Sequence, residues 1–184
     1  MPLREIQLGD LRDAFVAAVV LGAFSAVADW VWARYIPNGA VVPGVVHGVV
    51  VFVLLAIVVG RAARAPGAAK RLLLTLPIAG LLIAAGFYPL AYGIGYLGAL
   101  LVAWIAMWLA LALLRRRARG GNENVARSLL RGVLAALASG LAFWAVSGMW
   151  TDPAAHTSYL LRFAYWTFAF LPGFLALFWG QRRA

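Results

Sequence analysis

Six polar side chains stand out in an otherwise apolar sequence and are the residues best suited to bind a ligand or to do chemistry: Asp29, Arg34, His47, Asp152, His156 and Arg162. A charged residue at membrane depth costs about 2.5 to 3.5 kcal/mol on insertion scales, so it is generally paired or lines a polar cavity. We expect all six to lie in the outer half of a membrane domain. No comparable group is predicted in the inner half.

Asp29 is the clearest of these residues, because it continues a stripe of small or polar residues. Ala18, Gly22, Ser25 and Asp29 follow one another at spacings of four, three and four, which puts them on one face of a helix. This face should point toward protein or a cavity rather than toward lipid. Asp29 is therefore predicted to act as a charge partner or proton acceptor.

The other members of the predicted site supply complementary chemistry. Arg162 and Arg34 suit an anionic group, and His47, flanked by Gly44 and Gly48, suits a hydrogen-bond donor or a titrating group. Aromatic residues on the same side suit stacking on an organic ligand. The predicted ligand-binding residues are Asp29, Arg34, His47, His156, Tyr159, Arg162 and Trp166.

A structural interpretation of the same residues stays open. Arginines near helix ends extend to the head groups, Trp and Tyr gather at membrane interfaces in any case, and Asp29 equally suits a structural ion pair. Asp152 and His156 precede the last apolar segment, where Thr151 to Pro153 resembles a helix start.

The elements that position these residues follow from composition. Of 184 residues, 65% are hydrophobic and 12% are charged, against about 45 to 50% and about 25% in soluble domains. An ordinary soluble protein is thereby excluded. With no cysteine, the chain has no disulfide, no thiolate metal site and no CxxCH haem attachment.

Continuous apolar segments of the length that crosses a bilayer predict an all-α integral membrane protein with six helices in three hairpins. The predicted single domain spans residues 1–184. The helices cover approximately residues 14–36, 45–60, 72–88, 94–114, 129–150 and 158–179.

Basic residues are sorted to one side of this topology. Fourteen of the 16 precede the first helix, follow the last, or lie in the second and fourth connections. By the positive-inside rule both termini are cytoplasmic, in the inner membrane. The net charge of +10 then needs no nucleic-acid partner.

The connection between the third and fourth helices is predicted to be irregular. It combines Tyr88, Tyr92 and Tyr96 with Pro89, Gly93 and Gly95. Such a segment suits a lid or part of a pocket wall.

The sequence favours a protein that binds or translocates a small polar or anionic molecule through an outward-facing pocket between the first, second and sixth helices. In size, helix count and the spacing of Ala14 and Ala18, the chain resembles the substrate-capturing S components of vitamin transporters, in architecture only. No catalytic residue and no metal ligand is assigned, and no cofactor is identified.

Three alternatives stay open. The first is a redox subunit that binds quinone, or one haem b through His47 and His156. The second is a structural or assembly subunit, with other membrane proteins or a second copy as its partner. The third is an intramembrane lipid-modifying enzyme that uses Asp29 and His47 as acid and base.

Overall fold

The computed structural model describes residues 8–36, 40–121, 123–146 and 158–179. Within these ranges the chain is all-helical: α1 (Leu8–Tyr35), α2 (Val41–Ala62), α3 (Ala68–Ala118), α4 (Val125–Ala145) and α6 (Tyr159–Phe178). All five helices are long and apolar enough to cross a membrane. The predicted helical membrane architecture is confirmed at this level.

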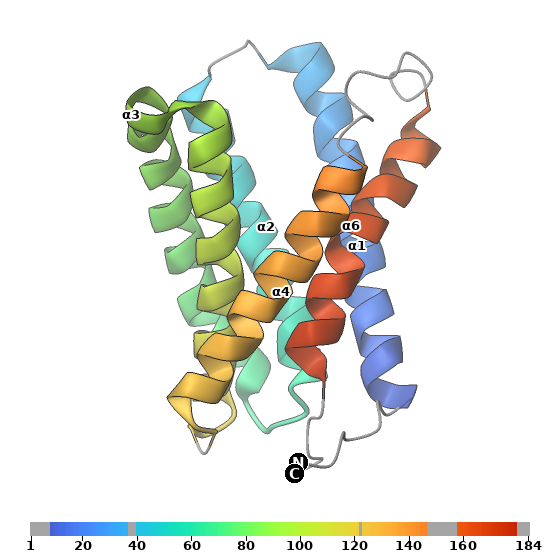
Figure 1. Cartoon of the computed structure of the whole chain (residues 1–184), viewed down its shortest axis with the longest axis vertical. Coiled ribbons are helices and arrows are strands. Elements are labelled where there is room, and N and C mark those ends of the chain that lie inside the picture. Colours follow the sequence, from blue (N-terminus) through green and yellow to red (C-terminus); the bar gives the residue numbers. More distant parts are fainter. Residues whose placement is uncertain (1–7, 37–39, 122, 147–157, 180–184) are drawn as a thin grey trace.

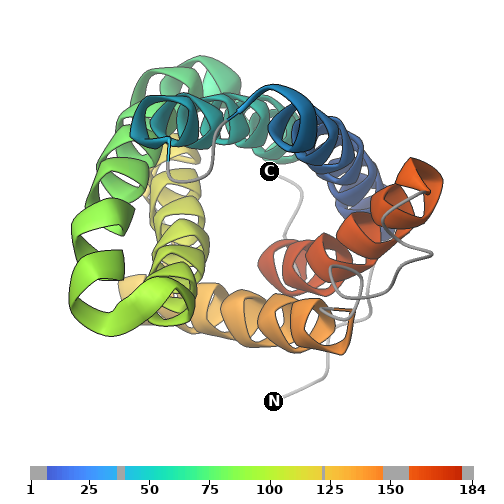
Figure 2. The same ribbon diagram turned by 90° about the horizontal axis from the view of Figure 1, so that it is seen from above.

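The helices are arranged as a ring. Each packs against the next along the chain, and α6 closes the ring by packing against both α4 and α1. Figure 2 shows this order from above. Every helix thus has a neighbour on either side. The helices α1 to α4 each expose several Leu, Val or Ile side chains.

The third helix turns back on itself. Its 51 residues would extend for about 77 Å at 1.5 Å per residue, more than twice the hydrocarbon thickness. At Gly95 the backbone is non-helical, with φ 79° and ψ 162°, and the helix divides there into two arms that lie side by side (Figure 1). Arg71 in the first arm donates from Nε and Nη2 to the Ala118 carbonyl of the second, at 3.1 and 2.6 Å.

The prediction of an irregular connection between helices 72–88 and 94–114, which are the two arms of α3, is wrong. Tyr88, Tyr92 and Tyr96 are all helical, and only Gly95 departs from helical geometry. A glycine backbone makes the whole reversal in one residue, so no loop is present to act as a lid. Tyr88 instead donates its hydroxyl to the Ala40 carbonyl at 3.2 Å, which joins α3 to the start of α2.

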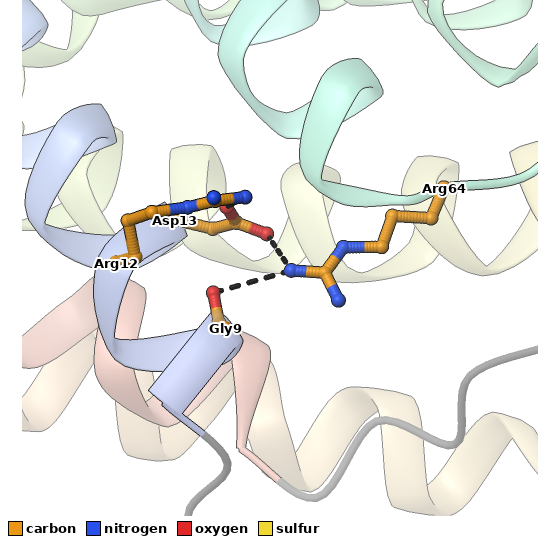
Figure 3. A network of polar contacts seen from close by, with 4 residues as sticks. All are labelled: Gly9, Arg12, Asp13 and Arg64. Carbon is orange, nitrogen blue, oxygen red and sulfur yellow. Dashed lines mark hydrogen bonds and ion pairs between the residues drawn. The ribbon is translucent and has the colours of Figure 1, made fainter.

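Arginines tie the helix ends together at the end of the bundle where α1 begins and α6 stops. Arg64, between α2 and α3, donates to Asp13 Oδ2 at 2.5 Å and to the Gly9 carbonyl at 3.2 Å (Figure 3). Arg115 of α3 donates to the Leu177 carbonyl of α6 at 3.1 Å. The Leu177 carbonyl lies in the last turn of α6, where carbonyls have no partner within their own helix.

The basic residues are distributed between the two ends as the sequence predicts. Among the described residues, Arg34 and Arg162 lie near the opposite end of the bundle, and every other Lys or Arg lies near the arginine-rich end. Following the predicted orientation, we name the end that carries Arg34 and Arg162 the outer end, and the arginine-rich end the inner end.

The Gly95 turn gives a direct test of the fold. Gly95→Ala should lower the free energy of unfolding by about 1 to 3 kcal/mol, because φ and ψ lie in a region that only glycine adopts without strain. Gly93→Ala is the matched control, since Gly93 is helical and a Cβ there would meet nothing within 4 Å. Thermal unfolding of the purified chain in detergent micelles compares the two, and equal midpoints would contradict the glycine turn.

Candidate functional site

The stripe of small residues on α1, predicted to point toward protein or a cavity, faces α6. Ala18, Gly22 and Ser25 are buried. A Cβ on Gly22 would lie 2.3 Å from Thr167 Oγ1 and 2.9 Å from the Thr167 backbone nitrogen. Only glycine allows α1 and α6 to approach this closely, and the approach brings Asp29 against α6.

Asp29 is held by two residues of α6. Trp166 donates its indole Nε1 to Asp29 Oδ2 at 2.8 Å, and Arg162 Nη1 lies 3.8 Å from the same oxygen. Arg162 and Trp166 are four residues apart, so they share one face of α6. The Trp166 contact is a hydrogen bond, whereas 3.8 Å is an ion-pair distance too long for one.

This charge pair is largely withdrawn from water. The side chain of Arg162 is 8% exposed and that of Asp29 is 22% exposed. Asp29 lies six residues before the end of α1, about 9 Å along the axis from its outer end. The Arg162 guanidinium also lies over the Tyr159 ring, 5.4 Å from its centroid. Each charge therefore has an opposite charge and an aromatic neighbour.

His47 lies on the other side of α1, within an aromatic cluster. Its ring stacks on Phe24 at a centroid distance of 5.4 Å and meets the edge of Trp32 at 6.0 Å. Because Phe24 and Trp32 precede and follow Asp29 on the same helix, His47 lies at nearly the depth of Asp29. The carboxylate and the imidazole thus flank α1 at one level.

One predicted residue, Arg34, is not joined to this cluster. Arg34 is exposed, and its guanidinium lies over the Trp30 ring at 5.1 Å. That position fits an arginine that extends to the head groups. His156, together with Asp152, lies outside the described residues.

A row of aromatic rings below Asp29, which sequence reasoning missed, fills the interior. Trp166, Phe170, Phe174 and Phe178 follow one another at intervals of four along α6, with neighbouring centroids 5.7 to 6.4 Å apart. Trp104 stacks on Phe170 at 5.5 Å. The four-residue spacing can be seen in the sequence, but the sequence does not show that this face of α6 points into the bundle. We name the four α6 residues the aromatic ladder.

The structure buries three polar residues near the inner end that the sequence analysis did not single out. Asp10, Arg115 and Ser128 are all buried near the inner end, from α1, α3 and α4 respectively. Sequence reasoning placed Arg115 in a basic connection, because it begins a run of three arginines. The helix extends through that run and turns this one arginine inward.

The part of the chain that the structure describes offers few side chains that could bind a metal ion or a haem iron. No group of three or more His, Asp or Glu side chains comes together there. The ring contacts of His47 in those ranges are with Phe24 and Trp32. Its proposed axial partner His156 is not among the described residues.

Comparison with known proteins found no matching family model, no matching curated protein and no matching solved structure. The architectural resemblance to S components stays a prediction.

A double-mutant cycle tests the ion pair. Asp29→Asn and Arg162→Gln should each lower the free energy of unfolding by about 2 kcal/mol, less than for a fully buried pair because Asp29 keeps some contact with water. The double variant should lose less than the sum of the single losses, by about 1 kcal/mol.

Chemical or thermal unfolding in micelles measures this coupling. Asp13→Asn combined with Arg162→Gln is the control, because Asp13 pairs with Arg64 at the inner end. Additive losses for Asp29 and Arg162 would show that the two charges do not interact.

Proposed function

We propose that this protein is a multi-pass inner-membrane protein that binds a small polar or anionic molecule in its outer half, between α1, α2 and α6. The observation that carries the proposal is the shielded pair of Asp29 and Arg162, whose atoms lie at ion-pair rather than hydrogen-bond distance. An anionic ligand group replaces Asp29 as the partner of Arg162. Trp166 then retains the Asp29 carboxylate through its indole N–H.

The residues around the pair suit an organic ligand. Tyr159 and Trp166 of α6 both contact the pair, and His47 on α2 lies at nearly the same level but on the other side of α1. Arginine binds carboxylate and phosphate groups through two parallel hydrogen bonds, which gives a preference for an anionic group of that shape. Arg34 is left out of the proposed site because it is exposed and lies over Trp30.

The topology proposed for this function has six membrane-spanning segments, with the two arms of α3 counted separately. The inner end, where the basic residues gather, faces the cytoplasm, and both termini lie on that side. Asp29, His47 and Arg162 then face the outer half of the bilayer.

The aromatic ladder favours binding over free passage through the bundle. Phe170, Phe174 and Phe178 are buried between the ion pair and the inner end. The three phenylalanine rings themselves offer a polar solute no hydrogen bond. Translocation therefore requires α6 to move relative to α1 or α4, whereas binding at the outer half does not.

The test is native mass spectrometry of the protein extracted gently from its own membranes. The wild-type chain should carry a small polar or anionic molecule, and Arg162→Lys should lower its occupancy about tenfold, because lysine keeps the charge but loses the planar fork. Asp29→Asn should raise the occupancy, because the ligand no longer competes with the Asp29 carboxylate for Arg162. Arg61→Lys at the inner end is the matched control, since Arg61 is exposed on α2.

The outcomes separate a binding site from a structural pair. A structural ion pair keeps its charge balance in Arg162→Lys, so unchanged occupancy in that variant contradicts the proposal. A wild-type chain without any small molecule, or one that carries haem, also contradicts it.

A further inference from the structure

Arg115 is the most deeply buried charged side chain among the described residues and is not used by the proposed outer site. It lies in the last turn of α3 and is 2% exposed. Its Nη1 donates to the Leu177 carbonyl at 3.1 Å, and its guanidinium lies 5.4 Å from the centroid of the Phe178 ring. One face and one nitrogen of the guanidinium are thus engaged by α6.

Among the described residues, the rest of this guanidinium has no hydrogen-bond partner. Arg115 Nε and Nη2 are buried and make no hydrogen bond in the part of the chain that the structure describes. Ser128 on α4 is 1% exposed, and its hydroxyl oxygen is also buried without a hydrogen bond to any described residue. Buried polar groups in proteins almost always have partners, so two unpaired guanidinium nitrogens indicate a missing acceptor.

The charges around Arg115 favour an anion. Arg119 and Arg131 repel the Arg115 guanidinium, whereas Glu123 and Asp10 attract it. Glu123 is already engaged, because its carboxylate pairs with Arg131 at 2.7 Å and its carbonyl accepts from Arg116. Cations therefore outnumber carboxylates at this point of the inner end.

We propose that the inner end binds a phosphate group, with Arg115 as the bidentate donor and with Arg119, Arg131 and Ser128 around it. Guanidinium Nε and Nη2 point in parallel and match two phosphate oxygens. Arg115 lies one turn before the end of α3, where a small local movement gives a ligand access. The phosphate belongs either to an anionic phospholipid head group of the adjoining leaflet or to a free phosphate.

The test uses the full chain in detergent micelles. Thermal unfolding is followed during titration with phosphatidylglycerol, phosphatidylcholine or inorganic phosphate at constant ionic strength. Phosphatidylglycerol should raise the midpoint, and phosphatidylcholine should not. Arg115→Lys should weaken this effect about tenfold, since the paired donors are lost.

Two further variants distinguish binding from structure. Asp10→Asn should strengthen phosphatidylglycerol binding, because a carboxylate that competes for Arg115 is removed. Arg61→Lys, exposed on α2, should leave it unchanged. If Arg115→Lys does not fold by circular dichroism, Ser128→Ala takes its place and should weaken binding about threefold, the loss of one hydrogen bond.

Each outcome decides the matter. Stabilisation by phosphatidylglycerol alone identifies a lipid head group, and equal stabilisation by inorganic phosphate identifies a free phosphate. Equal effects of phosphatidylglycerol and phosphatidylcholine overturn the proposal, as does unchanged binding in the folded Arg115 or Ser128 variant. Asp29→Asn and Arg162→Lys should not alter phosphatidylglycerol binding, so failure of the outer site is separable from failure of this one.

Discussion

The close packing of α6 against α1 on one side and α4 on the other is the contact on which the arrangement depends. Lipid gives no hydrophobic drive for helices to associate, so close backbone approach and interhelical hydrogen bonds supply the stability. Gly22 makes room for Thr167 at the α1 contact. At the α4 contact, Ser139 donates its hydroxyl to the Ala169 carbonyl at 2.9 Å. Without either contact the ring of helices would be open.

The same helix connects the polar groups at the two ends of the bundle. Arg162, in its first turn, pairs with Asp29, and the Leu177 carbonyl near its last residue accepts from Arg115. Between them the aromatic ladder presents only rings to the interior. The outer and inner charged groups are therefore separated by a layer in which no described residue is charged, and each must balance its own charge.

Much of the fold was predictable because hydrocarbon imposes simple rules on a sequence. Long apolar segments predicted helices, and the stripe that ends at Asp29 predicted which face of α1 meets protein. The reversal at Gly95 was not predictable in its sharpness, because a cluster of Tyr, Pro and Gly also fits a loop. The inward turn of Arg115 escaped prediction for a different reason: in Arg115, Arg116 and Arg117 the residue types are identical, and only the helix phase distinguishes them. The partners of Asp29 depend on a contact between segments distant in sequence, which no local pattern encodes.

The ring order also constrains how the chain folds. Four of the five main contacts between the described helices join helices that follow one another along the chain, so each can form as soon as the second helix of the pair has been made. The contact between α1 and α6 joins the first helix to the last, and it is this contact that brings Trp166 and Arg162 to Asp29. Asp29 therefore stays without these partners during synthesis until the last helix is inserted. A chain that stops before α6 retains four of its helices but never assembles the outer charge pair.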